Sequence, residues 1–176
     1  MFKRILVACD GSEAACKAVR LAAGIAAKDN AGLHLLHVVP EGPIPRGLER
    51  MLDSEHLAGA KGGDRAPPPA GQVPAEVQVW MRDQLRRDEL NTALHQLGKR
   101  ILDEAERIAL EAGAGSVSRE IADGDPVETI LEHAKTHQID LIAVGSRGLG
   151  NLKGMLLGSV SSRVSQLCQC SCITVK

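Results

Sequence analysis

The segment that begins at Gly145 and ends at Ser159 has the composition of an anion-binding loop. It carries five glycines in fifteen residues, and a serine follows both the first and the last of them. Glycine lets the backbone approach a phosphate closely, and the first N–H groups of a helix attract negative charge. We therefore expect the N–H groups of Gly158, Ser159 and Val160, with the hydroxyls of Ser159 and Ser161, to bind a phosphate group.

The charges around this segment also favour an anion. Residues 141–176 contain four basic side chains and no acidic one, whereas residues 1–140 have a net charge of −5. The whole chain has 21 Lys and Arg against 22 Asp and Glu, so it offers no general basic surface for nucleic acid or an anionic membrane. Its aromatic residues are Phe2 and Trp80, too few for a platform that stacks single-stranded nucleic acid. A single small phosphate compound fits this charge distribution better.

Two common nucleotide motifs do not match this segment. Gly150 is followed by Asn151 where a P-loop requires Lys, and the glycine spacing differs from that of the dinucleotide-binding turn. No Ser/His/Asp set can be identified from spacing, and no acidic pair resembles a two-metal site. Mg²⁺ that accompanies a nucleotide would therefore be held mainly by the phosphates and by serine hydroxyls.

The cysteines and histidines suggest no metal site. Cys168, Cys170 and Cys172 alternate, and thiolates at that spacing could bind Zn²⁺ or Cu⁺. No second Cys or His cluster stands nearby in the sequence, so we interpret them as small, buried thiols. The histidines are dispersed, and His34 and His37, three apart on a predicted strand, face opposite sides of it.

Apolar patterns predict the elements that hold the glycine segment. Short apolar runs typical of strands buried on both faces occur at 4–9, 33–39, 117–121, 139–144 and 172–175. Apolar residues at helical spacing predict helices over 12–27, 90–112 and 159–167, and a further helix that begins at Asp125. Strands that alternate with helices in this way are typical of an α/β fold with a parallel sheet.

Residues 40–75 interrupt this alternation. They are rich in proline and glycine and have little apolar periodicity, so we predict a flexible surface insertion, with a short helix around Leu48 to Leu52. A partner-binding arm is the alternative interpretation. The stretch from Glu76 to Glu89 is either an extension of the following helix or a separate short helix that carries Trp80.

Four separated motifs resemble those of the universal stress protein family, in its ATP-binding branch. They are Gly145-x2-Gly148-x9-Gly158-Ser159, the run from Ile5 to Ser12, the strand from Leu36 to Val39, and the helix start Gly124-Asp125-Pro126. The resemblance covers nearly the whole chain except roughly 42–88. It implies one domain over 1–176, with an open, Rossmann-like, five-stranded parallel sheet of order 3-2-1-4-5 and helices on both faces. A ligand would bind where strands 1 and 4 end, beside Asp10 and Gly145.

The resemblance also implies which residues bind ATP. The residues that would surround adenine and ribose are Ala8, Cys9, Asp10 and Val38. Those that would line the ribose and phosphates are Gly145, Arg147 and Gly148. Those that would hold the phosphates are Gly158, Ser159, Val160 and Ser161. The Asp10 carboxylate is a strong acceptor for a ribose hydroxyl or the adenine amino group. Its alternative role is to cap the loop before the first helix.

These observations favour an ATP-binding stress-response regulator that acts as a nucleotide-dependent homodimer. The resemblance places the dimer interface at the last strand, Cys172 to Val175, where oxidation could form intersubunit disulfides. A slow ATPase or phosphotransferase is one alternative, although the bases and metal ligands that phosphoryl transfer needs are missing. A non-nucleotide module whose protein partner docks on the insertion or the Trp80 helix is another. The apolar runs are too short for a signal peptide or a membrane span, and five cysteines indicate reduced thiols, so we expect a cytoplasmic protein.

Overall fold

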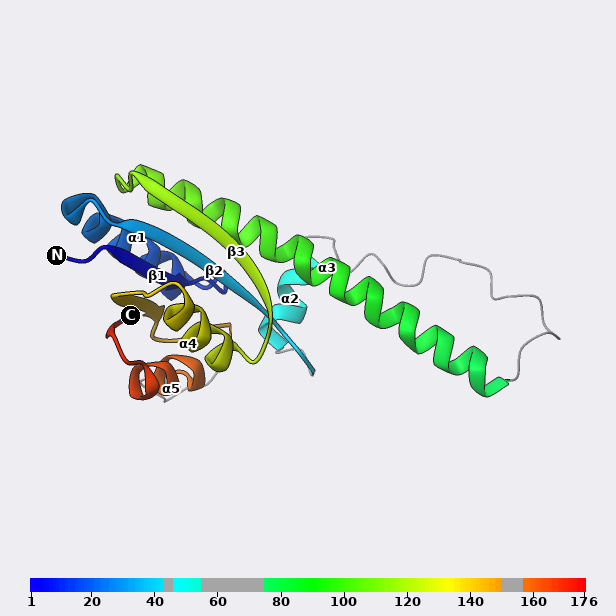
Figure 1. The fold of residues 1–176 in the computed structure, drawn as a ribbon. Coiled ribbons are helices and arrows are strands. Elements are labelled where there is room, and N and C mark those ends of the chain that lie inside the picture. The colour runs from blue at the N-terminus through cyan, green and yellow to red at the C-terminus, as the bar shows by residue number, and fades with distance from the viewer. Residues whose placement is uncertain (43–45, 55–74, 150–156) are drawn as a thin grey trace.

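Five strands alternate with helices along the chain in the computed structural model, which describes residues 1–42, 46–54, 75–149 and 157–176 (Figure 1). The elements are β1 (Arg4–Ala8), α1 (Glu13–Asp29), β2 (Gly32–Pro40), α2 (Arg46–Ser54), α3 (Ala75–Glu111), β3 (Ser116–Gly124), α4 (Pro126–Thr136), β4 (Leu141–Gly145), α5 (Ser159–Leu167) and β5 (Ser171–Val175). Each strand and helix predicted from the apolar patterns is present. The bounds differ by a few residues, except that α3 begins at Ala75 and the predicted helix at Leu90.

The sheet is parallel throughout and has the order β3-β2-β1-β4-β5, as predicted. The central strand β1 pairs on both sides, so that Ile5 lies opposite Leu33 of β2 and Leu141 of β4. The chain builds outwards from β1 to β3 and then crosses to β4 on the other side. Connections that diverge at such a point leave a crevice at the carboxyl ends of the two adjacent strands, here β1 and β4.

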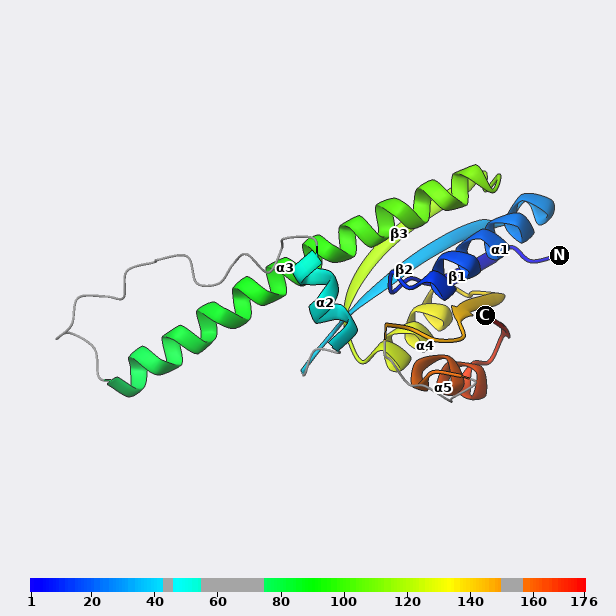
Figure 2. The same ribbon diagram turned by 180° about the vertical axis from the view of Figure 1, so that it is seen from behind.

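Helices cover both faces of the sheet. α1 and α3 pack on one face, and α4 and α5 pack on the other (Figures 1 and 2). Alternate residues of β1 enter two separate apolar clusters: Ile5 and Val7 face α1 and α3, whereas Leu6 faces α4. This division explains the continuous apolar runs, because a strand with helices on both sides must be apolar at every position.

Side-chain caps fix where the helices begin next to that crevice. Ser12 is the N-cap of α1 and accepts a hydrogen bond from the N–H of Ala15. Asp125 is the N-cap of α4, with Pro126 at the first helical position, and accepts from the N–H groups of Val127 and Glu128. Both helix starts were predicted at these positions. Ser and Asp act as caps because they offer an oxygen to N–H groups that have no partner inside the helix.

α3 is a single helix of 37 residues, so the stretch from Glu76 to Glu89 is an extension and not a separate helix. At ~1.5 Å per residue it is roughly 55 Å long. Its second half packs on the sheet, and its first half projects beyond it (Figures 1 and 2). In the described ranges, no helix combines the length and the apolar content needed to cross a membrane.

The predicted insertion at 40–75 contains the helix α2, which includes the expected short helix at Leu48 to Leu52. Leu48 and Leu52 are buried against the same apolar cluster as α1 and α3. Residues 43–45 and 55–74 lie outside the described residues, so the predicted flexibility of the insertion stays a prediction.

Candidate functional site

A cavity of about 290 Å³ opens at the carboxyl ends of β1, β2 and β4, next to the start of α5. All eleven residues that the sequence singled out line it. They come from segments far apart in the chain, which meet because parallel strands bring their carboxyl ends to one edge of the sheet. Ala8 and Gly145 end β1 and β4, Val38 lies near the end of β2, and Gly158 is the N-cap of α5.

One wall of the cavity is apolar and was not predicted. It is formed by side chains from β2, α4 and β4, which are Leu36, Ile130 and Val144 together with Val38. Their apolar character is visible in the sequence, but which of them face the cavity depends on how α4 packs against the sheet. A flat apolar wall of this kind suits a heterocyclic base better than a charged group.

The carboxylate of Asp10 has both of the roles considered for it. Its Oδ1 accepts a hydrogen bond of 2.9 Å from the N–H of Ser12, so it does cap the loop before α1. Its Oδ2 lies so close to Gly148 that a Cβ on that glycine would overlap with it. One oxygen therefore holds the loop, and the other lies beside the glycine segment on the wall of the cavity.

Ser12 connects the two loops that flank the cavity. Its hydroxyl donates to the carbonyl oxygen of Arg147 at 3.3 Å and accepts from the N–H of Ala15 at 3.2 Å. The backbone of Arg147 is thereby tied to the start of α1, while its guanidinium side chain is exposed. A cationic group at the rim of the cavity can approach a phosphate without the desolvation cost of a buried charge.

The hydrogen bonds at the start of α5 correct one expectation. The N–H of Gly158 is not free for an anion, because it donates to the carbonyl oxygen of Ser146 at 2.7 Å. The hydroxyl of Ser161 is also engaged, since it donates to the carbonyl oxygens of Ser146 and Gly158. The N–H groups without an intrahelical acceptor are those of Ser159, Val160 and Ser161, the first three residues of the helix.

Ser146 organises this end of the site, although it was not among the residues selected from the sequence. It is buried, its N–H donates to the carbonyl oxygen of Val175 at 2.6 Å, and its own carbonyl accepts the two bonds from the start of α5. It thus joins β4, β5 and α5. A serine after a strand-ending glycine was visible as part of the glycine segment, but these partners depend on the tertiary fold.

Two titratable groups that line the cavity, Cys9 and His37, are held in their neutral forms. Burial raises the pKa of the Cys9 thiol far above its usual range, and the neighbouring Asp10 charge adds to this, so Cys9 is no thiolate nucleophile. Burial lowers the pKa of His37, whose Nδ1 lies 2.7 Å from the carbonyl oxygen of Cys9, so a neutral ring donates this bond. Of the described residues that line the cavity, Asp10 is the only carboxylate.

The helix α2 of the insertion reaches the cavity. Leu48 lines it, and Gly47 lies so close to the backbone of Leu149 that any Cβ there would overlap with it. The insertion therefore covers part of the site through α2, which packs directly on Leu149 of the glycine segment.

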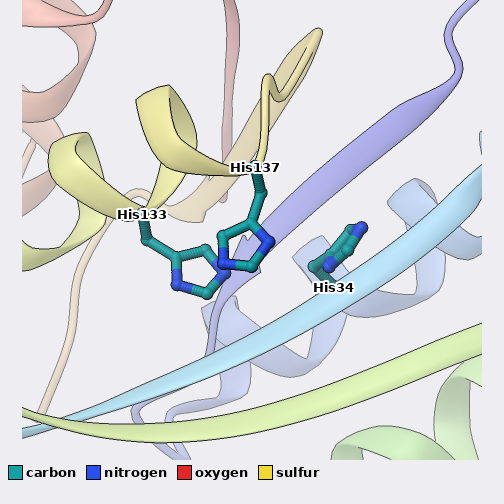
Figure 3. Close-up of side chains that lie close together, drawn as sticks. All are labelled: His34, His133 and His137. Atoms are coloured by element: carbon teal, nitrogen blue, oxygen red, sulfur yellow. The ribbon is translucent and has the colours of Figure 1, made fainter.

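The structure brings together three histidines that appeared dispersed in the sequence. His34 of β2 lies next to His133 and His137 at the end of α4 (Figure 3). The available signal was the spacing of four between His133 and His137, which places both on one face of a helix. His37 lies on the opposite face of β2, as predicted. Cys168, Cys170 and Cys172 are partly buried against the cluster under α4 and α5, as expected of small packed thiols.

Comparisons with known proteins agree with this architecture. The family model described as "Universal stress protein family" matches residues 1–176. The chain is 34% identical over 176 residues to the universal stress protein YxiE of Bacillus subtilis, covering all of both chains. The structure of universal stress protein UspA from Lactobacillus plantarum is similar with a TM-score of 0.61 and 25% identity, covering 99% of this chain and 97% of that one. A universal stress protein solved in complex with cAMP is similar with a TM-score of 0.59 and 24% identity, over 99% and 97% of the two chains. The chain described here belongs to the universal stress protein family.

Proposed function

We propose that this stress protein binds ATP in the cavity at the carboxyl ends of β1, β2 and β4. The observation that carries the proposal is that the two ends of the cavity differ in polarity. The cavity is apolar along β2 and α4, and it offers N–H donors and the guanidinium of Arg147 near the start of α5. The adenine base would lie on the apolar wall, and the phosphates at the N–H groups of Ser159, Val160 and Ser161. A triphosphate suits that end because residues 141–176 carry no acidic side chain.

Asp10 would bind the ribose. Its Oδ2 lies on the cavity wall between the apolar and the N–H-rich ends, beside Gly148. A carboxylate oxygen at that point can accept a hydrogen bond from a ribose hydroxyl. Gly148 leaves the space that such a contact needs, since a side chain there would displace the carboxylate. The fold is known to accommodate an adenine nucleotide in the cAMP complex of the related structure.

Mg²⁺ bound with the nucleotide would depend mainly on the phosphates. The cavity offers Asp10 as its one carboxylate in the described ranges, and that residue is occupied by Ser12 and by the proposed ribose contact. The exposed hydroxyl of Ser159 can add one oxygen ligand, and water would complete the octahedral shell that Mg²⁺ prefers. Among the described residues that line the cavity, Asp10 and His37 are both engaged in hydrogen bonds within the protein, which favours nucleotide binding with at most slow hydrolysis.

The physiological form that we propose is a homodimer through β5. β5 is an edge strand that pairs with β4 on one side, and Cys172 to Val175 are partly exposed. An unpaired strand edge is a ready surface for a second copy of the chain. The interface would be close to the site, since the carbonyl oxygen of Val175 accepts from Ser146. A bound nucleotide could thereby influence dimer formation, as a regulatory role requires.

Mass spectrometry of the purified, denatured protein tests the ligand directly. ATP released in near-equimolar amount supports the proposal, and isothermal titration calorimetry on stripped protein should then give one site per chain. Absence of nucleotide in the preparation together with no heat on adding ATP would refute it. Sedimentation velocity with and without ATP tests the dimer. If dimer formation depends on the nucleotide, a larger sedimenting species should be present with ATP.

A further inference from the structure

His34, His133 and His137 form a cluster at the opposite end of the sheet from the cavity. His34 lies near the start of β2, whereas the cavity residues lie near its end. α4 begins beside the cavity at Pro126 and ends at the cluster. Figure 3 shows the rings of His133 and His137 side by side on the end of α4, with His34 projecting from the adjacent strand. The cluster is therefore separate from the proposed nucleotide site.

The geometry of the cluster is close to that of a three-histidine metal centre. One ring nitrogen of each histidine lies within 4.8 Å of the others, and the rings of His133 and His137 stack with centroids 4.1 Å apart. Nitrogens bound tetrahedrally to Zn²⁺ at 2.0–2.1 Å are roughly 3.3 Å from each other. The two ring nitrogens that lie furthest apart must therefore approach each other by at most roughly 1.5 Å, which small side-chain rotations allow.

Partners on β3 orient two of the rings. The hydroxyl of Ser118 lies 2.9 Å from Nδ1 of His34, and a carboxylate oxygen of Glu120 lies 3.7 Å from Nδ1 of His133. If His34 Nδ1 donates to Ser118, its Nε2 is left as a metal ligand, and the carboxylate of Glu120 near His133 raises the basicity of that ring. Glu120 also supplies negative charge, while the nearby guanidinium of Arg4 is held by the backbone and side-chain oxygens of Gln138.

The protonation state suits a ligand as well. Burial lowers the pKa of both His34 and His133, and the neighbouring His137 lowers them further. The neutral imidazoles of His34 and His133, which are the form that binds a metal, therefore prevail at neutral pH. His133 is buried and His137 is more accessible, so the cluster has a rigid side and an open side towards solvent.

We propose that His34, His133 and His137 bind one divalent transition-metal ion of the Zn²⁺ class, with water in the fourth position. Three imidazoles suit Zn²⁺, Ni²⁺, Co²⁺ or Cu²⁺ and do not suit Mg²⁺ or Ca²⁺, which prefer oxygen ligands. The bound ion would join the start of β2 to the end of α4, two elements that are otherwise held together by packing.

The test is calorimetric titration of Zn²⁺ into the full chain after removal of metals with a chelator. Wild type should bind one Zn²⁺ per chain, and His34→Gln and His133→Gln should each weaken binding by more than the roughly 10–100-fold that loss of an outer partner costs. If His133→Gln does not fold, His137→Gln replaces it as the test variant, because the ring of His137 is more exposed. The matched control is His95→Gln, whose histidine lies on α3 beside Asp123 and should leave binding unchanged.

A second measurement separates this site from the cysteines. A chain with Cys168→Ser, Cys170→Ser and Cys172→Ser should bind Zn²⁺ as wild type does, and bound Co²⁺ should show no thiolate-to-cobalt charge-transfer band. Glu120→Gln should weaken Zn²⁺ binding by about tenfold, as expected of an outer partner. Failure of wild type to bind Zn²⁺, survival of binding in His34→Gln and His137→Gln, or its loss in the serine chain would each overturn the proposal.

Discussion

Replacement of Gly158 by valine tests the phosphate end of the cavity while changing the fold little. The backbone at Gly158 has φ −74° and ψ 165°, which any residue adopts. An added Cβ would lie 3.6 Å from the Cα of Arg147 and from the carbonyl oxygen of Ser146, and 3.7 Å from the hydroxyl of Ser161, which are ordinary contacts. The two further methyl groups of valine must then extend beyond these atoms, where the proposed phosphate would meet the start of α5.

The expected loss of affinity follows from the donors at that point. Three N–H groups at the start of α5 lack an intrahelical acceptor, and a hydrogen bond to a charged group contributes about 1.5–3 kcal/mol. If valine prevents two of these bonds, the loss is about 3–6 kcal/mol, so Kd for ATP should rise by roughly 100-fold or more. Stability should change by only about 1 kcal/mol, the difference between glycine and valine at an N-cap.

The assay is calorimetric titration of ATP into stripped protein, accompanied by urea denaturation of each variant. Gly115→Val is the matched control, because a Cβ there meets nothing within 4 Å and its backbone is outside the left-handed region. We expect wild-type affinity in the control and near-complete loss in Gly158→Val. A folded Gly158→Val chain that binds ATP as wild type does would refute the assignment of phosphates to the start of α5.

Three further predictions concern residues around the cavity. Asp10→Ala should weaken ATP binding by about tenfold, because it removes the ribose acceptor, and lower the unfolding free energy by about 1–3 kcal/mol, because it removes the bond from the Ser12 N–H. Calorimetry measures the affinity and urea denaturation the stability. Unchanged affinity would leave Asp10 with a capping role alone. Gly98→Ala should cost about 1–3 kcal/mol of stability by urea denaturation, because its Cβ would lie 2.7 Å from the ring of His37; unaltered stability would contradict that close packing. Burial lowers the pKa of His37 in the folded chain, so the unfolded chain binds the proton more readily and stability should fall as the pH drops below ~6.5, by up to about 1.4 kcal/mol per pH unit. Denaturation between pH 7 and pH 5 should show a smaller slope in His37→Asn, and an identical slope would assign the effect to other groups.

The parallel sheet could be predicted from short-range patterns, whereas most residues of the cavity followed from the resemblance to a family. Apolar runs identified the strands, and helices that alternate with them require a parallel sheet, whose strand ends meet at one edge. Asp10 and Gly145 could be brought together in this way without a structure. The strand order itself came from the resemblance to a family and not from the apolar pattern.

What could not be predicted depends on contacts between elements. The N–H of Gly158 is taken by the carbonyl oxygen of Ser146, because the start of α5 lies beside the end of β4. The three-histidine cluster required the pairing of β2 with α4, and a spacing of four in one helix supplied only two of its members. α3 extends through Glu76 to Glu89 as one helix, although the apolar stripe that identified it begins at Leu90.

The close approach of Gly98 to His37 gives the projecting part of α3 a mechanical connection to the cavity. Gly98 is in α3, its missing side chain leaves room for the ring of His37, and that ring holds the carbonyl oxygen of Cys9. A helix transmits displacement along its axis as a stiff rod, so force applied to the projecting half would reach the ring of His37 and, through it, the carbonyl oxygen of Cys9, two residues that line the cavity.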